Sequence, residues 1–306
     1  MSKRVSPLIN YMGGKFHIAK HIISLFDYSL PTYIELFAGG ANVLWQKKPH
    51  KIEILNDKDG DLINLYKVVK AEPKRFFREL YYMPFSRQLY YEIWEDWENG
   101  NKGKDDFERA VRYFYILRLS YSGKIERGLA FSLQRSKSET LRHILKNLKF
   151  YSDRLANVMI ENRDFREILD DVIRLKVKSV IYADPPYCGI KNYYKTDFAL
   201  QDHIDLAERL NALKDRCQIV LSYYDCELIE KYYSEKQGWK IKKVLTAKHS
   251  TKQINGSKRP LAEELIIFNY SDNTYLPLLN KEDDNELINH FKEDKNEKED
   301  RKASGI

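Results

Sequence analysis

The chain alternates between short runs of apolar residues and segments in which apolar residues recur every three or four positions. The runs contain many aromatic and β-branched residues and end in polar or turn residues, which is typical of buried strands. They lie at 32–40, 51–59, 179–187 and 217–225, and the helical segments lie at 41–48, 60–71, 202–216 and 226–236. Two final runs, 239–248 and 263–270, favour an antiparallel hairpin at the sheet edge. The pattern predicts an α/β fold with a mostly parallel sheet.

One long segment interrupts this alternation. Residues 73–157 are helical in pattern, aromatic and basic, and contain no convincing buried strand. We therefore expect a sheet domain made of residues 1–72 and 158–275, with residues 73–157 as an insertion. Residues 276–306 form a charge-rich tail that is nearly free of apolar anchors, which predicts a flexible segment.

Composition places the chain among globular proteins, because 43% of its residues are hydrophobic and no run of about 18 apolar residues suggests a transmembrane helix. The N-terminus lacks the apolar core of a signal peptide. The cysteines Cys188, Cys217 and Cys226 have no metal-binding spacing, which suits a reducing compartment. We expect a cytoplasmic protein without a metal, and its many lysines and tyrosines favour a bacterial or phage genome.

The formal net charge of +7 is unevenly distributed. Residues 281–306 carry nine acidic and six basic side chains, a net of −3, so residues 1–280 carry +10. Residues 111–150 hold nine Lys and Arg against two Glu, a net of +7. A basic block of this density indicates either a surface that binds a polyanion or a solvated helix face.

The clearest candidate for chemistry is Asp184-Pro185-Pro186-Tyr187, which directly follows an apolar run. Two prolines cannot continue the hydrogen bonds of a sheet, so the sequence predicts a rigid loop at the end of a strand. A carboxylate and a proline carbonyl are two acceptors, which suit the two donors of an exocyclic amino group, and a tyrosine ring can stack on a planar base. The alternative is a proline-rich turn in which Asp184 only caps a helix.

Two further features follow predicted strands. Gly39-Gly40 ends the first strand, and Asp57 ends the second, 18 residues after Gly39. This is near the spacing of about 20 residues at which a carboxylate reaches ribose hydroxyls in nucleotide-binding α/β folds. Because ligands of open α/β sheets bind beyond the carboxyl ends of the strands, we expect both features to meet Asp184 at one site.

Residues 7–270 resemble the Dam-type DNA adenine-N6 methyltransferases, in which the cofactor motif precedes the target-recognition region and Asp-Pro-Pro-Tyr follows it. The other matching segments are NYMGGK (10–15), YIELFAGGANVLW (33–45), LNDKDGDLINLY (55–66), YFYILRLSYSGK (113–124) and HSTKQINGSKRPLAEELIIFNY (249–270). The resemblance implies a Rossmann-like S-adenosylmethionine-dependent methyltransferase sheet with a helical target-recognition insertion. It also implies methyl transfer to the N6 amino group of an adenine that is flipped out of double-stranded DNA.

The resemblance also assigns roles to residues. Those expected to bind S-adenosylmethionine are Tyr11, Gly14, Lys15, Glu35, Phe37, Gly39, Gly40, Asp57, Asp164, Phe165 and Asp184. Those expected to hold the target adenine are Asp184, Pro185, Pro186 and Tyr187, with the tyrosine stacked on the base. The basic residues expected to contact DNA are Arg112, Arg118, Lys124, Arg127, Arg135 and Lys137. A covalent nucleophile is not needed, and Cys188 is interpreted as a bystander.

The chain departs from the family pattern at two places. The family usually has its second glycine at the position of Ala41, which leaves the form of this turn open. The segment YSGK (121–124) replaces the commoner YNG, which leaves the recognition sequence open. The alternatives are methylation of the cytosine amino group, where serine usually replaces Asp184, an RNA target, and a recognition subunit that lacks activity. A cognate restriction endonuclease is the further partner that we consider.

Overall fold

The computed structural model describes residues 6–11, 13–123, 125, 128–130, 137–188, 198–247 and 261–270. All of them belong to one unit, Met1–Tyr270. A second unit, Ser271–Ile306, contains the predicted tail and lies outside the described residues.

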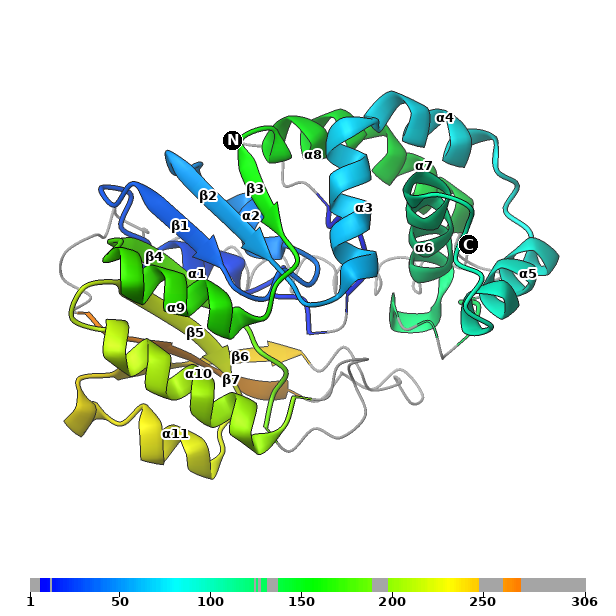
Figure 1. Cartoon of the computed structure of the whole chain (residues 1–306). Helices are drawn as coiled ribbons and strands as arrows, with labels where there is room; N and C mark the ends of the chain where they lie inside the picture. The colour runs from blue at the N-terminus through cyan, green and yellow to red at the C-terminus, as the bar shows by residue number, and fades with distance from the viewer. Residues whose placement is uncertain are drawn as a thin grey trace, which may run out of the picture. The chain divides into compact units, whose positions relative to one another are not determined.

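Seven strands of the described residues form one sheet in the order β3-β2-β1-β4-β5-β7-β6 (Figure 1). Neighbours among the first five run parallel, and β7 is antiparallel to both β5 and β6, so the predicted sheet and its closing hairpin are confirmed. The strands are β1 Thr32–Glu35, β2 Ile52–Asn56, β3 Val158–Glu161, β4 Ser179–Ala183, β5 Gln218–Tyr223, β6 Lys240–Ala247 and β7 Leu261–Phe268.

Strand β3 was not predicted from the sequence. It has only four residues at the edge of the sheet, and the side chain of Met159 is 55% exposed. A short, half-exposed edge strand lacks the continuous apolar run that marks the central strands.

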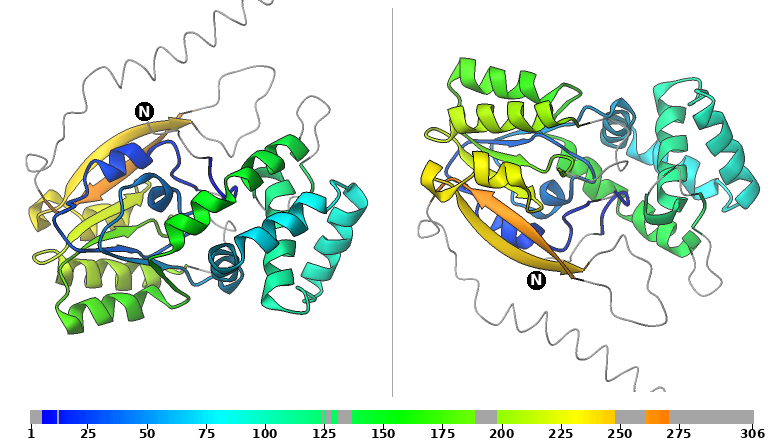
Figure 2. Two further views of the ribbon diagram at one scale, coloured as in Figure 1. Left: turned by 90° about the horizontal axis from the view of Figure 1, so that it is seen from above. Right: turned by 90° about the horizontal axis from the view of Figure 1, so that it is seen from below.

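Alternate residues of the central strands contribute to two different cores, as the period of two requires. Tyr33 and Val180 face one core, which α1 (Ala19–Ile23) and α2 (Asn42–Gln46) cover. Ile34 and Ile181 face the other core. Its covering helices are α9 (Phe165–Leu175), α10 (Leu200–Leu213) and α11 (Glu227–Tyr232), and Figure 2 shows the two groups on opposite faces of the sheet. The 3-10 helix η3 (Glu235–Gln237) follows α11.

The segment between β2 and β3 is helical, as predicted. Its helices are α3 (Gly60–Ala71), α4 (Pro73–Tyr82), α5 (Arg87–Glu98), α6 (Asp106–Leu119), the 3-10 helix η1 (Tyr121–Gly123), α7 (Lys137–Lys146) and α8 (Leu148–Leu155). Among the described residues of this segment, only Ser120 and Leu129 form a β-bridge. The buried residues of α6 continue the same apolar cluster that underlies β1 and β4. The division into two domains therefore stays a prediction.

An ion pair connects α8, the last helix of this segment, to strand β2 of the sheet. The carboxylate of Glu53 on β2 is buried, and Arg154 of α8 donates to its Oε1 at 2.9 Å. Lys47 donates to the same carboxylate from the loop after α2. None of the helices in the described part of the chain is long and apolar enough to cross a membrane.

Candidate active site

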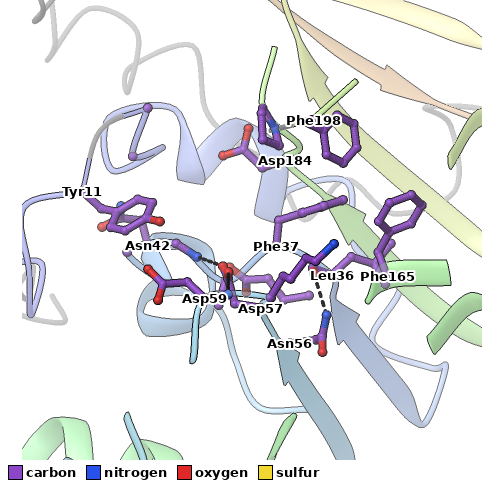
Figure 3. A pocket seen from close by; sticks show the side chains of 18 of the residues that line it. Tyr11, Leu36, Phe37, Asn42, Asn56, Asp57, Asp59, Phe165, Asp184 and Phe198 are labelled. Atoms are coloured by element: carbon purple, nitrogen blue, oxygen red, sulfur yellow. Dashed lines mark hydrogen bonds between the residues drawn. The ribbon is translucent and has the colours of Figure 1, made fainter. Parts of the chain in front are cut away.

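The order of the sheet reverses between β1 and β4, because β2 and β3 lie beyond β1 whereas β5 lies beyond β4. The loops after β1 and β4 therefore turn to opposite faces of the sheet and leave a crevice beyond the carboxyl ends of these strands. A cavity lies there (Figure 3). Its lining brings together every residue that the sequence assigned to the cofactor: Tyr11, Gly14, Lys15, Glu35, Phe37, Gly39, Gly40, Asp57, Asp164, Phe165 and Asp184.

The glycine turn after β1 forms one side of the cavity. Gly39 has a φ of +44°, and a Cβ atom there would lie 3.1 Å from the ring of Tyr11. Ala41 has a φ of +49°, although the left-handed region disfavours residues with a Cβ atom. The turn thus keeps the left-handed conformation at the position where the family usually has glycine.

Asp57 closes this turn from the end of β2. Its Oδ2 accepts a hydrogen bond from the backbone N–H of Gly39 at 2.9 Å, and its Oδ1 accepts one from the N–H of Asp59 at 2.9 Å. Burial raises the pKa of Asp57 to about 6, although these backbone donors act in the opposite direction. The carboxylate is therefore ionised at neutral pH and held in a fixed direction.

Glu35, at the end of β1, is buried in the wall. Burial raises its pKa to about 8, and the hydroxyl of Tyr33 donates to its Oε2 at 2.7 Å. A positive group brought into the cavity would favour the ionised form of this carboxyl group.

An aromatic wall lies at the other end of the cavity from Tyr11 (Figure 3). The ring centroids of Phe37, Phe165 and Phe198 lie 5.5, 5.6 and 5.7 Å apart in pairs. Asp164 is the N-cap of α9 and accepts a hydrogen bond from the N–H of Arg166 at 3.0 Å, which places Phe165 at the start of the helix. This wall offers an apolar surface for a planar ring.

The loop after β4 carries the predicted Asp-Pro-Pro-Tyr sequence. Asp184 Oδ1 lies 3.0 Å from the ammonium group of Lys15. Burial raises the pKa of Asp184 to about 6, against the effect of this lysine. Pro185 is buried, and Pro186 lines the cavity. The two prolines lack an N–H, so neither can donate to the carboxylate.

The expected position of Tyr187 is not what the structure shows. Its ring is only 8% exposed and packs against Tyr223 and Tyr224, at centroid distances of 5.7 and 4.4 Å. The ammonium group of Lys15 lies 4.7 Å from the same ring. A base can stack on Tyr187 only where one of these neighbours moves.

One of the six residues expected to contact DNA needs correction. Arg118 is 6% exposed and donates to Asn10 Oδ1 at 2.9 Å, so it is part of the protein interior. Arg112 pairs with Asp96 and Glu108, at 2.9 and 2.7 Å, and its contact with DNA stays a prediction. Lys124, Arg127 and Arg135 lie outside the described residues, and of Lys137 only the backbone is described, at the start of α7.

Sequence reasoning missed several residues of the cavity. Asn42, Lys58, Asp59, Arg166, Phe198 and Asp202 all line it. Asn42 and Asp59 lie within the quoted segments 33–45 and 55–66 and could have been found by their position. Phe198 follows a segment with no clear pattern. Tyr113, Leu117, Gly123 and Ile125 reach the cavity from the helical insertion, and no sequence signal joins them to the strand ends.

Known proteins resemble the chain over most of its length. Residues 11–248 match the family described as D12 class N6 adenine-specific DNA methyltransferase. The type II methyltransferase M.MjaIII of Methanocaldococcus jannaschii is 29% identical over 294 residues, which cover 87% of this chain and 99% of that protein. The type II methyltransferase M1.LlaDCHI of Lactococcus lactis subsp. cremoris is 24% identical over 281 residues, which cover 87% and 96%. The DNA adenine methylase of Escherichia coli K12 is 25% identical over 283 residues, with the same coverage.

The family model spans well over half of the chain and names both the base and the nucleic acid. The cytosine, RNA and recognition-only alternatives are therefore set aside. The chain belongs to the D12 class of N6 adenine-specific DNA methyltransferases, and it is an enzyme that uses S-adenosylmethionine to methylate adenine N6 in DNA.

Proposed function

We propose that the cavity at the ends of β1, β2 and β4 binds S-adenosylmethionine and that Asp184, with the carbonyl of Pro185, holds the amino group of the target adenine. The observation that carries the proposal is the place of Asp184. It lines the same cavity as the glycine turn and Asp57, and it also begins the rigid proline loop. The methyl donor and the amino group would therefore meet at this carboxylate.

The residues present fit this cofactor. The missing side chain of Gly39 lets the ring of Tyr11 pack closely on the glycine turn, and the ionised Asp57 suits ribose hydroxyls. The wall of Phe37, Phe165 and Phe198 suits an adenine ring. When bound, S-adenosylmethionine supplies a methyl group on a positively charged sulfur.

Asp184 would act on the nucleophile. The lone pair of adenine N6 is delocalised into the ring, and two acceptors that bind the amino hydrogens favour a more tetrahedral nitrogen. Asp184 and the Pro185 carbonyl would hold N6 toward the methyl group that bound S-adenosylmethionine would supply, with the electron pair of the broken carbon–sulfur bond left on sulfur. The extra proton leaves N6. Asp184 can receive it, because its pKa of about 6 leaves the carboxylate ionised at neutral pH.

No covalent intermediate on the protein is needed. Burial raises the pKa of Cys188 to about 11, and the neighbouring Cys226 acts in the same direction. Cys188 is thus a thiol at neutral pH and a poor nucleophile, which supports its interpretation as a bystander.

The helical insertion is proposed to bind double-stranded DNA and to present the flipped adenine. Flipping costs a few kcal/mol, which contacts to the DNA must offset. Arg112, Lys124, Arg127, Arg135 and Lys137 remain the proposed contacts. Two of the relatives are named type II methyltransferases, which favours a cognate restriction endonuclease as a partner that this methylation would restrain.

The test is incorporation of a labelled methyl group from S-adenosylmethionine into unmethylated DNA of mixed sequence, with the modified base identified by mass. Asp184→Ala should abolish the label on adenine N6. Asp215→Ala is the matched control, because Asp215 is exposed in the turn between α10 and β5. Retention of label by Asp184→Ala would contradict the assigned role. Mapping the labelled sites gives the recognition sequence that a partner endonuclease must share.

A further inference from the structure

Lys15 lies between two carboxylates at the edge of the cavity. Its ammonium nitrogen is 3.0 Å from Asp184 Oδ1 and 3.9 Å from Glu264 Oε2, and it donates to the carbonyl of Gly13 at 2.5 Å. The side chains of Lys15, Asp184 and Glu264 are 4%, 20% and 13% exposed. The ammonium group of Lys15 is thus the cation near both carboxylates, in a site that is largely closed to water.

Glu264 reaches this site from β7. Its Oε1 accepts a hydrogen bond from the hydroxyl of Thr246 on the paired strand β6, at 3.3 Å. Its Oε2 is buried and accepts no hydrogen bond from any described residue. A buried carboxylate oxygen without a donor is costly, so this arrangement needs an explanation.

Asp184 would receive a second donor during the reaction. Its Oδ1 lies 3.0 Å from the ammonium group of Lys15, and the proposed function adds a hydrogen bond from the adenine amino group to the same carboxylate, so two donors share one acceptor group. Lys15 cannot simply leave Asp184, because a buried charge that loses its partner is strongly destabilising. Glu264 offers the nearby alternative. A shift of about 1 Å brings a nitrogen at 3.9 Å into hydrogen-bond distance of its free oxygen.

We propose that Glu264 is a positioning residue for the methyl transfer, which receives the Lys15 ammonium group when the adenine amino group takes its place at Asp184. The inference rests on the proposed role of Asp184. The total charge of the site is the same before and after the shift. The oxygen of Glu264 that accepts no hydrogen bond from the described residues gains a donor in the complex with DNA.

The charges around Asp184 set the expected pH effect. The ionisable groups that face it are Lys15, Glu35, Tyr182, Tyr187, Tyr224 and Glu264. After burial, Lys15 lowers the pKa of Asp184 and Glu264 raises it. Removing the charge of Glu264 therefore lowers this pKa. The acid side of the pH profile of kcat, where Asp184 becomes protonated, should then move to lower pH.

The experiment compares E264Q with E263Q in the full-length enzyme on DNA that contains its recognition site. Glutamine keeps the size of the side chain and removes the charge. Glu263 is the matched control because it is the preceding residue of β7, is exposed, and pairs with Lys243 at 2.7 Å. E264Q should lower kcat about tenfold to a hundredfold, as a misplaced catalytic group does. It should leave the Kd for S-adenosylmethionine within about twofold, and the acid limb should move to lower pH. E263Q should match the wild type.

A second variant separates charge from shape. E264D keeps the charge on a shorter side chain, so kcat should fall less than in E264Q and the acid limb should stay in place. An E264Q enzyme with unchanged kcat, or with a lower kcat and an unmoved acid limb, overturns the inference. The inference is also overturned if E264D lowers kcat as much as E264Q and moves the acid limb of the pH profile by the same amount. D184N is measured beside them: activity retained by D184N contradicts the proposed role of Asp184 itself, whereas an inactive D184N with a normal E264Q contradicts only the role of Glu264.

Discussion

Arg118 Nη1 donates a hydrogen bond to Asn10 Oδ1 at 2.9 Å, which ties helix α6 of the insertion to the segment that leads to Lys15. Burial lowers the pKa of the Arg118 guanidinium to about 10, and the side chain is 6% exposed. Tyr113, five residues earlier on the same helix, donates to Asp59 Oδ2 at 3.3 Å. Helix α6 is thus a wall of the cavity proposed to bind the cofactor as well as part of the insertion.

Arg118→Ala should therefore affect stability and not the electrostatics of DNA binding. The loss of a buried side chain should cost about 2–4 kcal/mol of the free energy of unfolding. The slope of log K for DNA against log salt should stay unchanged, whereas loss of one phosphate contact lowers its magnitude by about 0.9. Denaturant titration and fluorescence anisotropy at several salt concentrations measure the two effects. Arg142→Ala removes an exposed arginine of α7 instead of a buried one, and both measurements on it serve as the comparison for Arg118→Ala. A smaller slope in Arg118→Ala would return this residue to the DNA surface.

Asp57→Asn should weaken binding of S-adenosylmethionine by about tenfold or more, because a hydrogen bond to a charged group contributes about 1.5–3 kcal/mol. The pKa of Asp57 is raised to about 6, and the ionised carboxylate is the better acceptor for hydroxyls. The affinity of the wild type should therefore fall as the pH drops through about 6. Calorimetric titrations across this range check the result. A variant that keeps the full pH dependence would show that another group, such as Asp184, controls it.

Gly39→Ala should damage the glycine turn. The new Cβ atom would lie 3.1 Å from the ring of Tyr11, and the φ of +44° is unfavourable for alanine, so a loss of about 1–2 kcal/mol in the free energy of unfolding is expected. Ala41→Gly makes the reverse change at a φ of +49°. Glycine relieves the backbone strain of the left-handed conformation, but the loss of a buried methyl group costs about 0.8 kcal/mol. The free energy of unfolding of Ala41→Gly should therefore change by less than about 1 kcal/mol. Thermal denaturation measures the stability of both variants. Equal losses of stability in Gly39→Ala and Ala41→Gly would contradict the strain assigned to this turn.

Phe198→Ala should raise the Kd for S-adenosylmethionine about tenfold, because stacking of a base on an aromatic ring contributes about 1–3 kcal/mol. Phe198 packs at 5.7 Å from Phe37 and 5.6 Å from Phe165 at the edge of the cavity. Phe85→Ala, an exposed phenylalanine that does not line this cavity, should leave the Kd unchanged. An unchanged Kd in Phe198→Ala would place the adenine ring elsewhere.

The sequence alone determined the central strands, the helical character of the insertion, and the residues at the strand ends. Each of these depends on local properties: apolar runs form buried strands, and two consecutive prolines cannot continue the hydrogen bonds of a central strand. The convergence of Gly39, Asp57 and Asp184 also followed, because parallel strands place their carboxyl ends at one edge of a sheet.

Only the tertiary structure decided which side chains are accessible. Arg118 and Tyr187 were expected to meet DNA and the target base, but Arg118 is buried against the segment around Asn10, and Tyr187 packs between two tyrosines and Lys15. Phe198 joins the cavity, and Glu264 reaches Lys15, through contacts between segments far apart in the chain. Such contacts depend on how helices and strands pack in three dimensions. The period of apolar residues shows that a side chain faces a core, and it does not show which partner that side chain meets there.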